Sequence, residues 1–140
     1  RSLEKARYFA EQIDAHPDFE LVTAPELCLL TYRYVPAEVQ AAMQVAIDQG
    51  DKVKLARFNE LLDGLTQFIQ KHQREQGKSF VSRTRIQPAR YFRLPTVVFR
   101  VVLANPLTSH EILNQVLIEQ GEIAALDNEF LPALLAMVNE

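Results

Sequence analysis

The chain has 140 residues, 48% of them hydrophobic, and a formal net charge of −3. This length allows one domain with a substantial core. The slightly acidic balance gives no electrostatic basis for binding nucleic acid or an anionic membrane. The single cysteine, Cys28, excludes an internal disulfide and agrees with a reducing cytoplasm. No apolar run approaches the ~20 residues that span a bilayer, and no signal peptide is visible.

The first part of the chain predicts a helix followed by a hairpin. Apolar residues recur at helical spacing over residues 3–15. Two strands, Phe19–Thr23 and Glu26–Val35, are expected around a turn at Ala24-Pro25, and the second is rich in β-branched and aromatic residues. A connection this short favours antiparallel pairing. Because the chain starts without Met and directly in a helical pattern, we expect it to be a piece of a larger protein.

Two helices are expected next. Pro36–Ile47 favours a helix, with proline at a tolerated first-turn position. After a break at Gln49–Asp51, a long amphipathic helix is predicted over Lys52–Gln76, with Gly77 at its C-cap.

The second half of the chain predicts two more strands and two helices. Strands are expected at Phe80–Ile86 and Thr96–Ala104, separated by an irregular connection over Gln87–Pro95. Helices are expected at Thr108–Ala125 and, shorter, at Leu131–Val138. The order of elements predicts an α/β domain of the α+β type, in which an antiparallel sheet carries helices mainly on one face.

Arg100 is the residue that points most directly to a function. It stands alone in the apolar run Thr96–Leu103, with no acidic residue nearby in sequence. A buried guanidinium without a partner is costly, and its planar fork suits two-point binding of a carboxylate. The residues alone leave an alternative, in which Arg100 is a structural arginine on the solvent face of a half-exposed strand.

Four other arginines are weaker candidates for anion or inter-domain contacts. Arg83 and Arg85 alternate on one strand, and we assign them to its polar face, where solvation or inter-domain salt bridges are favoured over ligand binding. Arg90 and Arg93 flank two aromatic residues in the loop before the last strand. Such a loop could bind an anion or dock a partner domain, although an ordinary surface loop is the favoured interpretation.

No catalytic or metal-binding residue is predicted. The three histidines, His16, His72 and His110, lack metal-ligand spacing. Cys28 lies in an apolar segment and is expected to be a small core residue. Phosphate-loop, dinucleotide-binding and zinc-binding signatures are absent.

Three segments, in order, resemble strands of one protein family. They read TYRYVP over 31–36, SFVSRTR over 79–85 and FRVVLANP over 99–106. Together they resemble the C-terminal domain of the group II pyridoxal-phosphate-dependent amino-acid decarboxylases, most closely the bacterial glutamate-decarboxylase-like enzymes, a branch that includes aspartate decarboxylases. The resemblance implies a fold of the aspartate-aminotransferase type. Residues 1–17 would then be a helix leading from a missing large domain, and residues 18–140 the small C-terminal domain.

The resemblance implies a carboxy-lyase that releases CO₂ from glutamate or aspartate with pyridoxal 5'-phosphate as its cofactor. The full-length protein would be a cytoplasmic homodimer. This domain, with the large domain of the same protein as its partner, would help to close the active site, and Arg100 would contact a substrate carboxylate. The family's His-Xaa-Xaa-Lys cofactor motif has no counterpart in the chain, so we expect the fragment alone to bind no cofactor and to be inactive.

Two other functions stay open on the residues alone. One is a free-standing anion-binding or regulatory α/β domain with Arg100 as the anion anchor. The other is a protein-interaction domain whose exposed sheet docks another chain.

Overall fold

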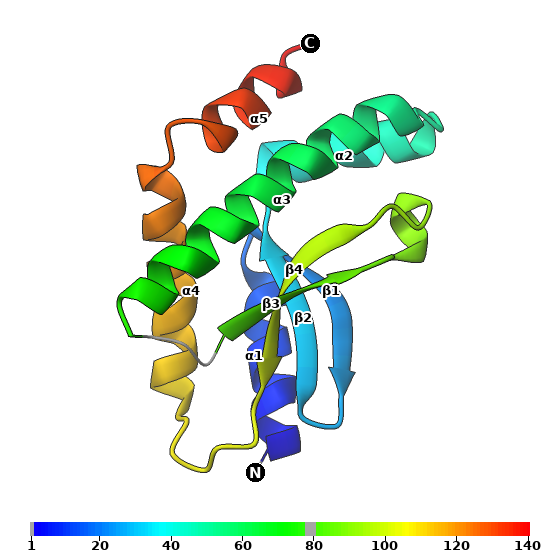
Figure 1. The fold of residues 1–140 in the computed structure, drawn as a ribbon. Helices are drawn as coiled ribbons and strands as arrows, with labels where there is room; N and C mark the ends of the chain where they lie inside the picture. Colours follow the sequence, from blue (N-terminus) through cyan, green and yellow to red (C-terminus); the bar gives the residue numbers. More distant parts are fainter. Residues whose placement is uncertain (1, 78–80) are drawn as a thin grey trace.

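A computed structural model describes residues 2–77 and 81–140 of the chain (Figure 1). A short 3₁₀ turn, Ala89–Tyr91, lies in the connection between the last two strands. The helices are α1 (Ser2–Ala15), α2 (Ala37–Asp48), α3 (Lys52–Glu75), α4 (His110–Leu126) and α5 (Phe130–Val138), and the strands are β1 (Phe19–Glu26), β2 (Leu29–Tyr34), β3 (Val81–Ile86) and β4 (Thr96–Val102).

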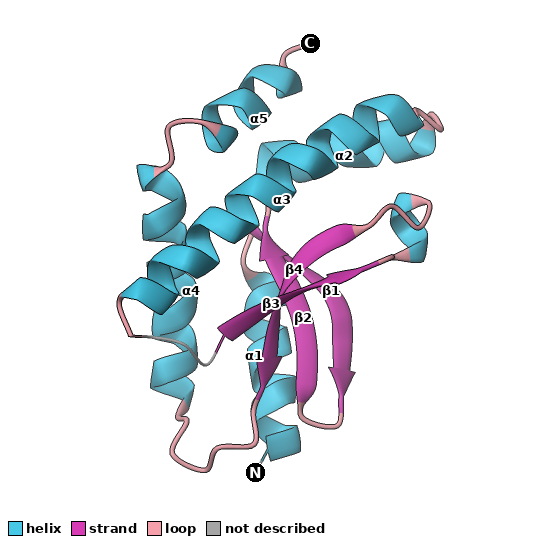
Figure 2. Cartoon of the chain, in the orientation of Figure 1, coloured by secondary structure: helices cyan, strands magenta, loops and turns pink. Residues whose placement is uncertain are grey.

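The four strands form one antiparallel sheet in the order β1-β2-β4-β3. Tyr32 of β2 lies opposite Phe99 of β4, and Leu30 lies opposite Val101. Paired residues share a face of the sheet, and these four side chains are buried in the main core. Helices α1 and α4 run beside the sheet and α3 crosses it diagonally (Figure 2). The predicted fold class is therefore confirmed.

Helix α1 contributes directly to this core. Its apolar positions recur at helical spacing, so they form one stripe along the helix. The stripe packs against β1 and β2, and the ring of Phe9 meets that of Tyr32 edge-on, with 5.4 Å between centroids. The buried residues of α1 are Ala6, Phe9, Ala10 and Ile13.

The predicted turn of the first hairpin is wrong. Ala24-Pro25 lies inside β1, and the chain reverses two residues later, at Leu27, whose φ is 58°. The register between the two strands shifts between Thr23 and Glu26. Because β1 is an edge strand, a proline without an N–H is tolerated at such an irregularity.

Most other boundaries lie close to the predicted ones. Helix α3 ends at Glu75 with Gln76 as its C-cap, so Gly77, with φ of 78°, follows the cap instead of forming it. Ser109 caps α4, where its hydroxyl accepts the N–H of Ile112 at 3.2 Å. The predicted start of the third strand, Phe80, lies outside the described residues.

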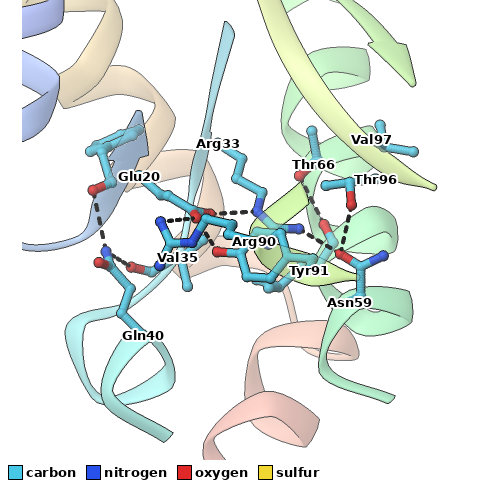
Figure 3. A network of polar contacts seen from close by, with 12 residues as sticks. Glu20, Arg33, Val35, Gln40, Asn59, Thr66, Arg90, Tyr91, Thr96 and Val97 are labelled. Atoms are coloured by element: carbon cyan, nitrogen blue, oxygen red, sulfur yellow. Dashed lines mark hydrogen bonds and ion pairs between the residues drawn. The ribbon is translucent and has the colours of Figure 1, made fainter. Parts of the chain in front are cut away.

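A buried charged pair sits where the sheet meets α3. Arg33 of β2 is fully buried, and its Nε donates to Oε1 of Glu20 at 2.8 Å (Figure 3). Its Nη1 donates to Oδ1 of Asn59 on α3, also at 2.8 Å. Burial lowers the pKa of Arg33, but the charges of Glu20 and Tyr91 and the hydrogen bond to Glu20 together outweigh burial, so the pKa lies above its ordinary value. The pair is stabilising only because the two partners are present together.

The loop before β4 completes this network. The hydroxyl of Tyr91 donates to Oε2 of Glu20, and Nη1 of Arg90 lies 3.1 Å from the same oxygen. The guanidinium carbons of Arg33 and Arg90 each lie 5.0 Å from the centroid of the Tyr91 ring. The amide of Asn59 donates to the carbonyl of Pro95 at 2.8 Å. The network therefore joins β1, β2, α3 and the start of β4.

The network predicts a loss of stability at alkaline pH. Burial, followed by the charge of Glu20, raises the pKa of Tyr91 to about 12 from 10.0. The folded state then keeps a proton that the unfolded state loses as the pH rises above 10. Stability from this group is complete below pH 10 and falls between pH 10 and 12, by at most about 1.4 kcal/mol per pH unit. Urea unfolding between pH 9 and 11.5 measures it, and Tyr91→Phe should be less stable at pH 9 but show a shallower slope. Equal slopes in the two proteins would contradict the prediction.

A glycine pair tests the packing of α3 against α5. A Cβ placed on Gly64 would overlap the ring of Phe130, whereas a Cβ on Gly121 of α4 would meet nothing within 4 Å. Gly64→Ala should lower the melting temperature, because overpacking costs about 1–3 kcal/mol and exceeds the gain in helix propensity. Gly121→Ala is the matched control and should stabilise by about 0.5–1 kcal/mol. Equal effects at the two positions would show that Phe130 moves aside freely.

Candidate functional site

Arg100 lies on the sheet face opposite the core residues. It stands opposite Thr31 of β2 and Ser82 of β3, and its side chain is exposed. The prediction of a buried arginine in need of an internal anion is therefore wrong for this domain. Helix α3 contacts Arg33 and Thr96 on this same face and both are buried, but Arg100 lies farther along β4, beyond that cover. Within the described ranges, its guanidinium forms no ion pair and no hydrogen bond, so it is available to a carboxylate from outside.

The surroundings of Arg100 offer no competing negative charge. The hydroxyl of Thr31 donates to that of Thr23 at 2.7 Å. Val102 shares the face and is 42% exposed. Glu20 is on the same face by register, but Arg33 and Tyr91 already engage its carboxylate. The side chains directly across the strands from Arg100 are therefore hydroxyl groups, and the charged groups farther along this face already pair with one another.

Arg83 and Arg85 lie on the other side of the sheet. They stand opposite Phe99 and Val97, and they share their side of β3 with the buried Val81. Both are exposed because β3 is an edge strand. Their exposure agrees with the prediction of a solvated side of the strand, and the register adds that this side is the one that carries Phe99 and Val97 on β4. Arg100 therefore does not form one site with them.

Asp63 of α3 joins the helix to this edge. Its Oδ1 accepts the backbone N–H of Val97 at 2.9 Å. Burial raises the pKa of Asp63 above its ordinary value, against the opposing effects of that hydrogen bond and of the charges of Arg33 and Arg85. The carboxylate therefore acts mainly as a structural acceptor at the start of β4.

Arg90 and Arg93 have different environments in the loop between β3 and β4. Arg90 pairs with Glu20, so its contact lies within the domain (Figure 3). Arg93 is exposed in the left-handed region with φ of 61°, next to Phe92 at 53°. The ammonium of Lys52 lies 5.1 Å from the centroid of the Phe92 ring. Contact of Arg93 with an anion or another domain stays a prediction.

Sequence reasoning missed Arg33, the arginine that is buried. It stands in an apolar strand just as Arg100 does, so the same signal was present. The missing clue was register: in the observed hairpin Glu20 lies directly opposite Arg33. The correct turn alone would have set Glu20 opposite Val35, and the two register shifts in β1 bring Arg33 to that place.

The histidines and the cysteine occupy packing positions and a turn. His16, His72 and His110 each pack against an aromatic ring. Cys28 is half-buried in the hairpin turn, so its expected place in the core is corrected. Over residues 2–77 and 81–140, no group of histidine, cysteine and acidic side chains could hold a metal ion. In the same ranges no helix is long and apolar enough to cross a membrane.

Comparison with known proteins finds one curated relative. The chain is 59% identical over 138 residues to a protein of Aliivibrio fischeri (strain ATCC 700601 / ES114) named aspartate 1-decarboxylase. The match covers 99% of this chain and 24% of that protein, so the chain spans about a quarter of the relative's length. No family model matches the chain.

Solved structures share the fold at low sequence identity. Mouse CSAD in apo form is 19% identical with a TM-score of 0.67, covering 89% of this chain and 24% of that one. The glutamate decarboxylase domain of a Vibrio parahaemolyticus protein, described as a diaminobutyrate-pyruvate transaminase and L-2,4-diaminobutyrate decarboxylase, is 15% identical with a TM-score of 0.62, covering 89% and 21%. Oryza sativa TDC with PLP and tryptamine is 15% identical with a TM-score of 0.61, covering 89% and 22%. The chain therefore has the fold of a domain found in larger decarboxylases.

Proposed function

We propose that the chain is the C-terminal domain of a pyridoxal-phosphate-dependent decarboxylase in which Arg100 binds a substrate carboxylate. The observation that carries this proposal is the exposed side chain of Arg100 on the sheet, whose guanidinium forms no ion pair or hydrogen bond with the residues that the structure describes. A two-point grip on a carboxylate orients the reacting molecule as well as holding it.

The relatives support a decarboxylase, and the substrate class follows from Arg100. The name of the 59%-identical protein gives aspartate as its substrate. Aspartate and glutamate each carry two carboxylates, so a lone cation on a face without competing acids suits either. We propose an acidic amino acid as the substrate of the intact protein, which we further propose to be a cytoplasmic homodimer.

The described residues do not fit the role of cofactor holder. Lys52 and Lys71 are exposed, and Lys5 and Lys54 are half-buried. Nζ of Lys5 is engaged by the carbonyls of Asn105 and Pro106, at 3.0 and 3.2 Å. None of these lysines lines a described pocket. Together with the missing His-Xaa-Xaa-Lys motif in the sequence, this supports the proposal that the cofactor lysine lies in another part of the protein and that this domain contributes to substrate binding.

The exposed position of Arg100 also suits a free-standing anion-binding domain. The two functions differ in the length of the parent gene. Several hundred upstream residues with a His-Xaa-Xaa-Lys motif would support the decarboxylase, and an open reading frame beginning near residue 1 would exclude it.

Arg100→Lys in the intact protein tests the site. Lysine keeps the charge but loses the planar fork. A charge-assisted hydrogen bond contributes about 1.5–3 kcal/mol, so kcat/KM for aspartate or glutamate should fall at least about tenfold. The matched control is Arg7→Lys, an exposed arginine on α1, which should leave kcat/KM unchanged. Melting temperatures of both variants should equal that of the parent. Near-normal activity of Arg100→Lys, or a loss of activity that follows a lower melting temperature, would contradict the assignment of Arg100 to substrate binding.

The 140-residue chain by itself should show neither decarboxylation nor a link to the cofactor. The reason is that the chain lacks the His-Xaa-Xaa-Lys motif that supplies the cofactor lysine in the family it resembles. Borohydride reduction after adding pyridoxal phosphate, followed by peptide mass spectrometry, checks this. Stoichiometric labelling of one lysine in the chain would overturn the prediction.

A further inference from the structure

A shallow pocket opens where the edge strand β3 meets α3. Its volume is about 240 Å³, several times the roughly 30 Å³ that a water molecule occupies in the liquid. It lies on the helix side of the sheet, away from Arg100. Its lining residues are Gln67, Arg83, Thr84, Arg85 and Val97.

The two arginines bring two positive charges to this pocket on the same side of one strand. Residues two apart along a strand are separated by about 7 Å. In the part of the chain that the structure describes, neither guanidinium forms an ion pair or a hydrogen bond. Like charges this close repel each other, and an anion between them removes the repulsion. Guanidinium forks also match the oxygens of phosphates and carboxylates.

No acidic side chain of the described residues neutralises the pair. Asp63 is close enough for Arg85 to influence its pKa, but it forms no ion pair with either arginine. Its Oδ1 is occupied by the backbone N–H of Val97. Asp63 therefore offsets part of the charge of Arg85, the two arginines leave the pocket net positive, and Gln67 adds an amide that can donate to a bound oxygen.

We propose that this pocket binds a small dianionic oxyanion. Arg83 and Arg85 of β3 would both contact the oxyanion, and Gln67 would contact it from α3. Two fixed charges call for a ligand of charge −2, and the volume suits a phosphate group or a short dicarboxylate better than a larger molecule. The site is separate from the carboxylate-binding role of Arg100, because the two sets of arginines project from opposite faces of the sheet.

Arginine-specific labelling tests the site in the intact protein. Phenylglyoxal modification followed by peptide mass spectrometry reports the reactivity of each arginine separately. Inorganic phosphate, at ionic strength matched with chloride, should slow labelling of Arg83 and Arg85 at least about fivefold at saturation, since occupancy follows mass action. Arg7 and Arg74, both exposed elsewhere, should be unaffected. Malonate, tested in parallel, shows whether a dicarboxylate binds more tightly than phosphate.

Paired double variants supply the control. Arg83→Gln/Arg85→Gln should lose calorimetrically detected phosphate binding, whereas Arg7→Gln/Arg74→Gln, with the same change in net charge, should keep it. Equal protection by chloride, absence of protection, or unchanged binding by the first variant would overturn the proposal. Alternatively, the wild type shows no protection of its arginines by phosphate while Arg83→Gln/Arg85→Gln forms larger species. In that outcome the two arginines prevent the free edge of β3 from pairing with another chain. None of these readouts depends on decarboxylation, so they stand apart from the test of Arg100.

Discussion

The ion pair between Arg33 and Glu20 is the interaction on which the rest of the structure depends. It is buried at the junction of two strands, a long helix and the loop before β4. Removal of one partner would leave an uncompensated charge in the core, a loss of about 3–5 kcal/mol. Because a whole domain is stable by only about 5–15 kcal/mol, this junction has little tolerance for change. Asn59, which accepts from Arg33, also donates to the carbonyl of Pro95 just before β4, so the pair is linked to the start of that strand.

The arginines show that one residue type takes different roles at different positions in the sheet. Arg33 is enclosed, and its charge is used to join elements. Arg100 projects from the same face farther along the sheet, where its side chain is exposed to solvent. Arg83 and Arg85 border the helix side at an unpaired edge. Position along the strand and place in the sheet decide among these roles, since the chemical group is the same.

The sequence predicted the elements well, because hydrophobic period and capping residues are local properties. It failed where the answer depends on distant parts of the chain. The turn at Ala24-Pro25 was misplaced because an edge strand tolerates a proline, and edge position is a property of the whole sheet. The burial of Arg100 was misjudged because the cover of this face by α3 ends before Arg100. Arg33 was overlooked because its partner follows from the hairpin register, which depends on the turn and on two register shifts in β1. The place of the chain in a larger decarboxylase stays a proposal.

Helix α1 has a mechanical consequence. Phe9 and Ile13 are completely buried between the helix and the sheet. A domain boundary drawn at residue 18 would therefore cut through the core and expose it. Any force applied at the N-terminal end would pass through α1 into β1 and β2 without a flexible joint between them. The domain therefore moves as one body from its first helix onward, and a hinge to any neighbouring domain on that side would have to precede α1.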